Sequence, residues 1–242
     1  MKKIHGKRTK ARRILFLFLF LLGTPTPISL SIGIPMVALG QLINLITYGV
    51  LTKRGDLVTA GPYAWCRNPF YLGTLLSDFG FCTICDPSRI PTLAVTLAYA
   101  AVQLTLYHLR ILAEEKKLRE RFGAEYEAYC ARVRRRIVPS LLSAIRYGGF
   151  SMRWSAGLAL NNRIFSRVAS AAFWCVAFWA ICILTGGGAN CLISFVNPKF
   201  QAICKNAWLL AAAGGTIVIY AASRIAEHVH FREPNPETTP RI

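Results

Sequence analysis

The chain has 242 residues, of which 54% are hydrophobic, and a formal net charge of +18. Its apolar residues form long runs, a pattern typical of membrane proteins and not of a soluble domain with one core. The basic residues gather between these runs, so the charge does not by itself indicate a nucleic-acid partner, and none is expected. The sequence therefore predicts an all-α, polytopic membrane helix bundle with about five to six transmembrane helices and a cytoplasmic amphipathic segment.

The apolar runs differ in length. Several are shorter than the ~20 residues that a helix needs to cross the hydrocarbon core, so tilted or broken helices are expected. The first run contains three prolines, which predict either a helical hairpin between Gly23 and Gly33 or one kinked span. A cleaved signal peptide over residues 1–23 is not favoured, because no small-x-small cleavage pattern follows it. The runs are 14–50, 70–85, 90–112, 164–184 and 207–222.

The distribution of charge predicts a topology. With the N-terminus in the cytoplasm, all Lys and Arg residues except Arg89, Lys199 and Lys205 fall on the inner side. This asymmetry follows the positive-inside rule, and it also favours contact with anionic lipid head groups. We therefore expect a multi-pass integral membrane protein with both termini in the cytoplasm.

The eight cysteines do not indicate a disulfide framework in a chain of this length. A bridge between Cys191 and Cys204 is possible, although unpaired cysteines are favoured. Cys82 and Cys85 have no second cysteine pair or histidine nearby, so no metal site is expected.

Composition divides the chain into three parts. Residues 1–13 form a basic tail, and residues 14–140 form the predicted core, with cofactor-binding segments at 61–73 and 110–139. Residues 141–242 form an extension that contains two further spans and a polar tail. The role of this extension and the oligomeric state remain open.

The segment GPYAWCRNPFYLG, residues 61–73, is unlike the apolar sequence around it. Asn68 is a good N-cap and Pro69 suits the first helical position, so a helix is expected to begin here. Backbone N–H groups at such a start favour an anionic ligand group. Asp78 lies deeper on the same face; it either has a function or, as favoured here, accepts from a hydroxyl or amide of a neighbouring helix.

Residues 113–139 form the most strongly charged segment. An apolar stripe at helical spacing and basic residues on the other faces predict an amphipathic helix on the membrane surface, broken at Gly123. Two features exceed what an anchor needs: adjacent Glu114 and Glu115, and the cluster Arg134 to Arg136. The stripe consists of Leu118, Phe122, Tyr126, Tyr129 and Val133.

Five motifs between residues 61 and 139 occur in an order that is more specific than any one of them. The ordered set resembles the isoprenylcysteine carboxyl methyltransferase family of integral membrane methyltransferases, a group similar to the phospholipid N-methyltransferases. The resemblance covers about residues 50–140. The motifs are Gly61-Pro62-Tyr63, Arg67-Asn68-Pro69-x-Tyr71-x-Gly73, Glu114-Glu115-x-x-Leu118, Phe122-Gly123-x-x-Tyr126-x-x-Tyr129, and Val133 to Pro139.

This resemblance implies S-adenosylmethionine as the cofactor, bound at the cytoplasmic boundary between membrane helices and the amphipathic segment. Asn68 replaces the histidine of the eukaryotic pattern and resembles bacterial members, which suggests a bacterial inner membrane. The family's closing Arg-x-Ile-Pro has one extra residue here, so either Arg135 or Arg136 matches the family arginine. Residues 140–242 have no counterpart in the compact members.

The residue types suit that cofactor. A glutamate can accept from ribose hydroxyls or the α-amino group, a helix start with a nearby arginine can hold the α-carboxylate, and tyrosine rings suit adenine and the sulfonium. The predicted cofactor-binding residues are Tyr63, Asn68, Tyr71, Gly73, Glu114, Glu115, Tyr126 and Tyr129. The predicted catalytic residues, which would hold an acidic acceptor, are Arg67, Arg110, Arg135 and Arg136; Arg110 could instead pair with Glu114 one turn away.

The sequence thus predicts methyl transfer from S-adenosylmethionine to a lipophilic or small acceptor, with a carboxylate favoured. A phospholipid amine and a thiol are the alternative acceptors, and membrane lipids are expected partners. A second hypothesis is a lipid-binding or partner-binding membrane protein without enzymatic activity. A transporter is less favoured, because only Asp78 is a deep ionisable residue. His108 could line the cavity, although a packing role is favoured.

Overall fold

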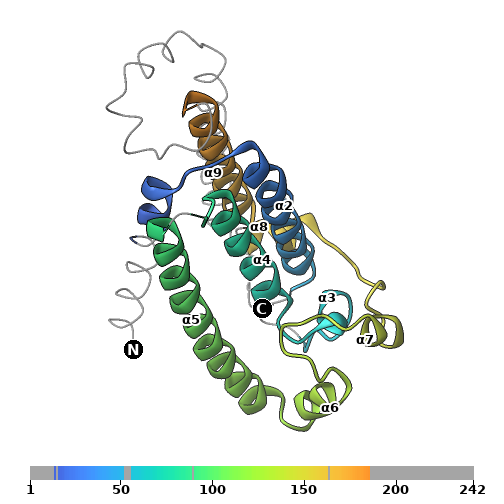
Figure 1. Cartoon of the computed structure of the whole chain (residues 1–242). Helices are drawn as coiled ribbons and strands as arrows, with labels where there is room; N and C mark the ends of the chain where they lie inside the picture. Colours follow the sequence, from blue (N-terminus) through green and yellow to red (C-terminus); the bar gives the residue numbers. More distant parts are fainter. Residues whose placement is uncertain (1–13, 15, 52–55, 89, 163, 186–242) are drawn as a thin grey trace, which may run out of the picture.

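The computed structural model describes residue 14 and residues 16–51, 56–88, 90–162 and 164–185. These residues form helices and loops, with no strand in the described ranges, and they pack as an elongated bundle (Figure 1). Residues 16–22 are helical. The further helices are α2 (Pro27–Val50), α3 (Pro62–Trp65), α4 (Pro69–Ile84), α5 (Ile90–Phe122), α6 (Ala124–Arg132), α7 (Leu141–Arg146), α8 (Ala156–Asn161) and α9 (Ile164–Thr185).

Three of these helices are long and apolar enough to cross a membrane: α2, α5, and α9 over Ile164–Ile183. Helix α4 has 16 residues, which is fewer than a full crossing needs, yet it lies among these helices in Figure 1. The predicted all-α membrane bundle is therefore confirmed. The span expected at 207–222 and the Cys191–Cys204 pair lie outside the described residues.

The first apolar run forms two helical segments separated by residues 23–26, in agreement with the hairpin interpretation. Thr26 caps α2, because its Oγ1 accepts from the Ser29 N–H at 3.1 Å and Pro27 takes the first helical position. The Thr24 N–H donates to the Cys85 carbonyl at 3.1 Å, which attaches the break to the end of α4. Pro35 remains inside α2.

Helices α2 and α4 pack closely through small residues. A Cβ on Gly33 would come within 2.6 Å of the Gly80 carbonyl oxygen, and one on Gly73 within 2.6 Å of the Gly40 carbonyl oxygen. The glycines are seven residues apart on each helix, so they follow one seam. Such seams let two membrane helices approach at backbone contact and gain dispersion energy.

Helix α5 faces α4 through long polar side chains. Asp78 on α4 accepts from the Tyr99 hydroxyl at 2.9 Å, from Gln103 Nε2 at 2.8 Å and from the Tyr107 hydroxyl at 2.7 Å. These donors lie four residues apart on one face of α5. The favoured interpretation of Asp78, as an acceptor for neighbouring hydroxyl and amide groups, is therefore confirmed.

Helix α5 is longer than a membrane crossing requires. Its 33 residues span about 50 Å at 1.5 Å per residue, more than the ~30 Å hydrocarbon core. The chain reverses at Gly123, whose φ of 50° suits a residue without a Cβ, and α6 folds back. The expected break at Gly123 is confirmed, and the apolar stripe packs against the rest of the protein. The position of this segment along a membrane surface stays a prediction. Tyr126, Tyr129 and Val133 pack with Leu57, Tyr63, Leu118 and Phe122.

Candidate functional site

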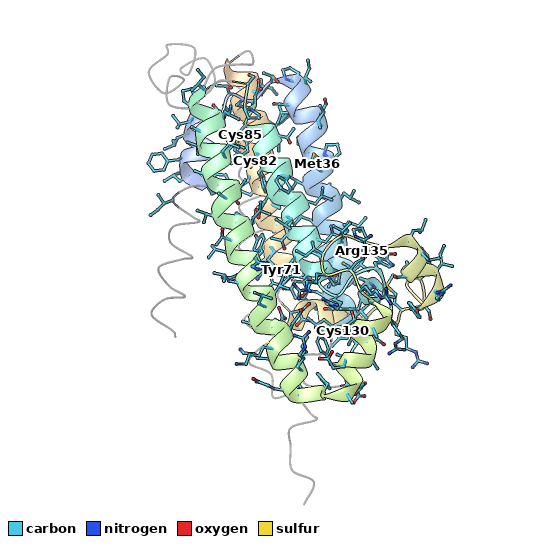
Figure 2. The ribbon with its side chains drawn as sticks, turned by 60° about the horizontal axis from the view of Figure 1, so that its bottom comes forward. Met36, Tyr71, Cys82, Cys85, Cys130 and Arg135 are labelled. Atoms are coloured by element: carbon cyan, nitrogen blue, oxygen red, sulfur yellow. The ribbon has the colours of Figure 1, made fainter. Side chains whose placement is uncertain are left out.

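A cavity of about 570 Å³ lies at the end of the bundle where α6 folds back. Its walls come from the end of α2, the loop before α3, α3 itself, the start of α4, the end of α5, and α6. Figure 2 shows Tyr71 and Cys130 toward this end, with Cys82, Cys85 and Met36 near the other. Such a volume suits a small organic ligand. The lining residues are Tyr48, Leu51, Asp56, Leu57, Val58, Tyr63, Arg67, Asn68, Pro69, Phe70, Tyr71, Glu114, Leu118, Arg121, Phe122, Tyr126 and Tyr129.

The first turn of α4 forms one wall of the cavity. The helix begins at Pro69 with Asn68 in the cap position, as predicted. The Asn68 side chain does not cap the helix, however; its Nδ2 lies 3.5 Å from Glu115 Oε1. Pro69, Phe70 and Tyr71 all line the cavity. The positive end of the α4 dipole therefore faces the space in which a ligand would sit.

The segment after α6 pairs with the segment before α4. The Arg67 N–H donates to the Arg135 carbonyl, and the Asn68 N–H donates to the Arg136 carbonyl, both at 2.9 Å. These backbone bonds bring two distant stretches of the chain together. They explain why both stretches are needed to build one site.

The two adjacent glutamates have different environments. Glu114 lines the cavity, and its Oε2 accepts from the Tyr71 hydroxyl at 3.1 Å. Glu115 is 1% exposed and lies behind the wall, where its Oε1 is 3.1 Å from Arg67 Nε and its Oε2 is 3.4 Å from Arg136 Nε. Glu114 can therefore contact a ligand, whereas Glu115 positions Arg67 and Asn68.

Three tyrosines of the cavity are kept neutral. Burial raises the pKa of Tyr63, Tyr126 and Tyr129 well above the usual range, and Glu114 adds to the effect at Tyr63. The Tyr129 hydroxyl donates to the Tyr63 carbonyl at 2.8 Å, which connects α6 with α3. At neutral pH these groups offer aromatic faces and hydroxyl donors, and they cannot act as bases.

Six of the eight predicted cofactor-binding residues line the cavity, together with Arg67 of the predicted catalytic set: Tyr63, Asn68, Tyr71, Glu114, Tyr126 and Tyr129. Glu115 and Gly73 do not, because Glu115 lies behind the wall and Gly73 packs against Gly40 and Asn44 of α2. Arg110, Arg135 and Arg136 also lie outside the lining. Arg136 binds Glu115, and the Arg135 carbonyl accepts from the Arg67 N–H. The ion pairs among the described residues do not include one between Arg110 and Glu114. His108 is exposed.

Several residues near the cavity were not predicted. Tyr48, Asp56, Phe70 and Arg121 line it. Arg167, in the first turn of α9, places its guanidinium 5.3 Å from the centre of the Phe70 ring and 6.0 Å from that of Tyr48. The only signal for Arg167 was a basic residue where an apolar run begins. The described part of the chain contains no group of three His, Cys, Asp or Glu residues that could hold a metal ion.

The comparisons with known proteins agree with this arrangement. Residues 27–120 match the model of the isoprenylcysteine carboxyl methyltransferase (ICMT) family. Protein-S-isoprenylcysteine O-methyltransferase of Rattus norvegicus is 31% identical over 101 residues, which are 41% of this chain and 34% of the relative. Protein-S-isoprenylcysteine O-methyltransferase B of Arabidopsis thaliana is 31% identical over 114 residues, 42% of this chain and 55% of the relative.

A third relative has a different name. Cobalt-zinc-cadmium resistance protein CzcN of Cupriavidus metallidurans is 32% identical over 106 residues, 40% of this chain and 46% of the relative. The chain thus spans between 34% and 55% of the length of these three relatives. No solved structure matches it significantly.

The matched region contains the start of α4 and Glu114 and Glu115, the elements that meet at the cavity. The names of the family and of two of these relatives indicate a methyltransferase. The resemblance inferred from the motifs is confirmed, since residues 27–120 of this chain match the model of the isoprenylcysteine carboxyl methyltransferase family.

Proposed function

We propose that this chain is an S-adenosylmethionine-dependent integral membrane methyltransferase that acts at the cytoplasmic membrane boundary. The observation that carries the proposal is the cavity of about 570 Å³ between the two motif segments. Two bonds join those segments across the cavity wall, Tyr71 to Glu114 and Arg67 to Glu115. A bundle that served only as a scaffold has little use for a polar site closed in this way.

The residues of the cavity fit the proposed cofactor. Arg67 and the first turn of α4 would hold its α-carboxylate, since both present positive charge to the same wall. Glu114 would accept from the ribose hydroxyls or the α-amino group. The neutral rings of Tyr63, Tyr126 and Tyr129 would cover the adenine and the sulfonium. When bound, the cofactor supplies an electrophilic methyl group.

A carboxylate acceptor is favoured over an amine or a thiol. A carboxylate arrives already anionic, so no base has to remove a proton before it attacks. Arg167 lies beside the cavity over two lining rings, and Arg121 is part of the lining. These cations would attract an acidic acceptor and hold it for an in-line displacement. A phospholipid amine would instead require a carboxylate such as Asp56 to accept a proton.

Binding of the cofactor is the first test. Titration of S-adenosylmethionine and of its demethylated product into the full chain in detergent should release or absorb heat. Glu114→Gln should weaken binding about tenfold, because a hydrogen bond to a charged group contributes about 1.5 kcal/mol or more. The control is Glu120→Gln on the same helix, whose carboxylate is 63% exposed and should not affect binding.

The outcomes separate the hypotheses. No binding by the parent chain would refute the enzyme and favour a lipid-binding or partner-binding protein. Equal binding by the parent and Glu114→Gln would keep the enzyme and move the site away from Glu114.

The acceptor class needs a second test. The full chain is incubated with methyl-labelled cofactor and, separately, a prenylated cysteine, a phospholipid with a primary amine and a small thiol. A carboxyl methyl ester releases its label as volatile methanol in mild base, whereas N-methyl and S-methyl products keep it. A base-stable product would overturn the preference for a carboxylate.

A further inference from the structure

Helix α7 and the loop that follows it expose a surface rich in apolar side chains. Leu141, Leu142 and Ile145 on α7 are 69%, 67% and 66% exposed, and Phe150 in the loop is 68% exposed. Large apolar side chains gathered in this way on a protein surface usually mark a contact with a partner or a membrane. We call this surface the α7 patch; it consists of Val138, Leu141, Leu142, Ile145, Phe150, Met152 and Trp154.

The opposite side of α7 is fixed to the rest of the molecule. Ala144 is buried, and the Ser140 N–H donates to the Trp65 carbonyl at 2.9 Å. Trp65 Nε1 donates to the Gly149 carbonyl at 2.9 Å, and a Cβ on Gly149 would overlap the Trp65 ring. The orientation of α7 is therefore set by α3, and its apolar side is held outward.

The segment of the chain that contains the α7 patch carries charge of one sign. Residues 128–162 contain no Asp, Glu or Lys. Their basic residues are all arginines, which can bind phosphate through two parallel hydrogen bonds. Those in the described ranges are all exposed and are Arg132, Arg134, Arg135, Arg136, Arg146 and Arg153. A surface of this composition suits an anionic and amphipathic partner and disfavours a basic one.

The place of α7 in the fold identifies that partner. In Figure 1, α7 stands out to the side of the bundle, beyond α3 and at the cavity end of the spanning helices, and the rotated view of Figure 2 shows Arg135 on the same side. In a membrane crossed by α2, an element that projects sideways at this level would lie where lipid surrounds the bundle. Interfacial helices combine buried apolar residues with arginines at the head groups in this way.

We propose that the α7 patch docks on anionic phospholipids of the leaflet at the cavity end of the bundle. Leu141, Leu142 and Ile145 enter between the head groups, and Arg146 and Arg153 bind lipid phosphates. Helix α3 carries both Trp65, which holds α7, and Tyr63, which lines the cavity. Docking therefore fixes one wall of the cavity at the lipid surface, whatever the cavity binds.

Hydrogen exchange measured by mass spectrometry tests the proposal on the full chain in nanodiscs. The peptide amides of residues 141–150 are compared in discs of phosphatidylcholine alone and discs that also contain phosphatidylglycerol. Exchange should be about tenfold slower in the anionic discs, because two arginines near such a leaflet contribute at least that much. Residues 124–132 of α6 serve as the internal reference and should exchange equally in both.

Charge variants separate docking from general attraction. Arg146→Gln combined with Arg153→Gln should remove most of the difference between the two lipids. The matched control, Lys116→Gln combined with Lys117→Gln on the exposed side of α5, should preserve it. Equal exchange of the parent in both lipids would overturn the proposal, as would protection that rises with the number of chains per disc, which would indicate an interface between copies. Full protection of the amides of residues 141–150 in phosphatidylcholine alone would also overturn the proposal. It would indicate that another segment of this chain covers the α7 patch.

Discussion

The two sides of α4 are built on different principles. On the α2 side, glycines at Gly33 and Gly40 face Gly80 and Gly73, and the backbones are in contact. On the α5 side, the helices stand apart and are bridged by charged or hydroxyl groups at Asp78, Tyr71 and the Arg67–Glu115 pair. The contact between α2 and α4 requires glycines, which have no side chains. The contact between α4 and α5 requires side chains that form hydrogen bonds and ion pairs.

This difference assigns different tasks to the two interfaces. A glycine seam has no room for a ligand and holds α2 and α4 as one unit. Long side chains between α4 and α5 leave space, and at the end of the bundle that space becomes the cavity. Every bond that bridges α4 and α5 there also fixes a residue of the cavity wall. Changes on the α2 side should therefore affect folding, and changes on the α5 side should also affect binding.

The largest effect is expected at the glycine seam. Gly40→Leu would place a side chain against the Gly73 carbonyl and Ser77, and neither helix can yield without moving the other. Overpacking usually costs about 1–3 kcal/mol, and a clash with the backbone of the facing helix should exceed that range and reduce the recovery of folded protein. Thermal unfolding and gel filtration in detergent measure the effect.

The same substitution at Gly157 in α8 is the control, because that residue is exposed and its added Cβ would be 3.6 Å from the nearest atom, Ser155 Oγ. A Gly40→Leu protein with the stability of the Gly157→Leu protein would show that the seam is not close-packed.

Glu115→Ala should have the next largest effect. It removes the buried carboxylate that binds Arg67 and Arg136 and leaves Arg67, whose side chain is 9% exposed, without a carboxylate partner. Breaking a buried pair in this way costs about 3 kcal/mol. Unfolding in denaturant and cofactor titration should both respond, since Arg67 lines the cavity. Glu120→Ala is the matched surface control; loss of binding at unchanged stability would instead indicate direct contact between Glu115 and the ligand.

The motifs were sufficient to predict which segments of the chain meet. Proline and asparagine chemistry predicted the start of α4, and the ordered motifs predicted that residues 61–73 face Glu114 and Glu115. The start of α4 and the pairing of the two motif segments depend on residue types and their spacing along the chain. Both can therefore be predicted from the sequence.

The rotation of α5 about its axis could not be predicted. Adjacent residues on a helix point about 100° apart, so only one of Glu114 and Glu115 can face the cavity. Packing of α5 against its neighbours decides which one does. The same limit applies to Gly73, since a glycine in a motif indicates close approach without saying whether a ligand or α2 approaches. The apolar stripe of α6 was clear, but a stripe does not reveal whether lipid or protein covers it.

Asp78→Asn should have a moderate effect confined to the α5 side. The amide keeps one acceptor oxygen and replaces the other with a donor, so at least one of Tyr99, Gln103 and Tyr107 loses its acceptor. Hydrogen bonds between membrane helices contribute about 0.6 to 2 kcal/mol, so a loss of about 1 kcal/mol is expected. Thermal unfolding measures it, with Asp86→Asn at the far end of α4 as the control. An effect as large as that of Gly40→Leu would contradict the distinction between the two sides.

The smallest effect on stability is expected from two Tyr→Phe variants. These variants separate the hydrogen bonds that shape the cavity from those that only hold α4 and α5 together. The rings of Tyr71 and Tyr107 lie 5.5 Å apart, but the Tyr71 hydroxyl donates to Glu114 in the cavity, and the Tyr107 hydroxyl donates to Asp78 deeper in the bundle. Each variant should lose about 0.5 to 1 kcal/mol of stability, the net contribution of one hydrogen bond. Only Tyr71→Phe should also change cofactor affinity, by about threefold, because Glu114 then loses the donor that orients it. Parallel unfolding and titration of the two variants distinguish these roles. Equal loss of affinity in both would mean that the separation of α4 and α5, and not the orientation of Glu114, determines how the cavity binds its ligand.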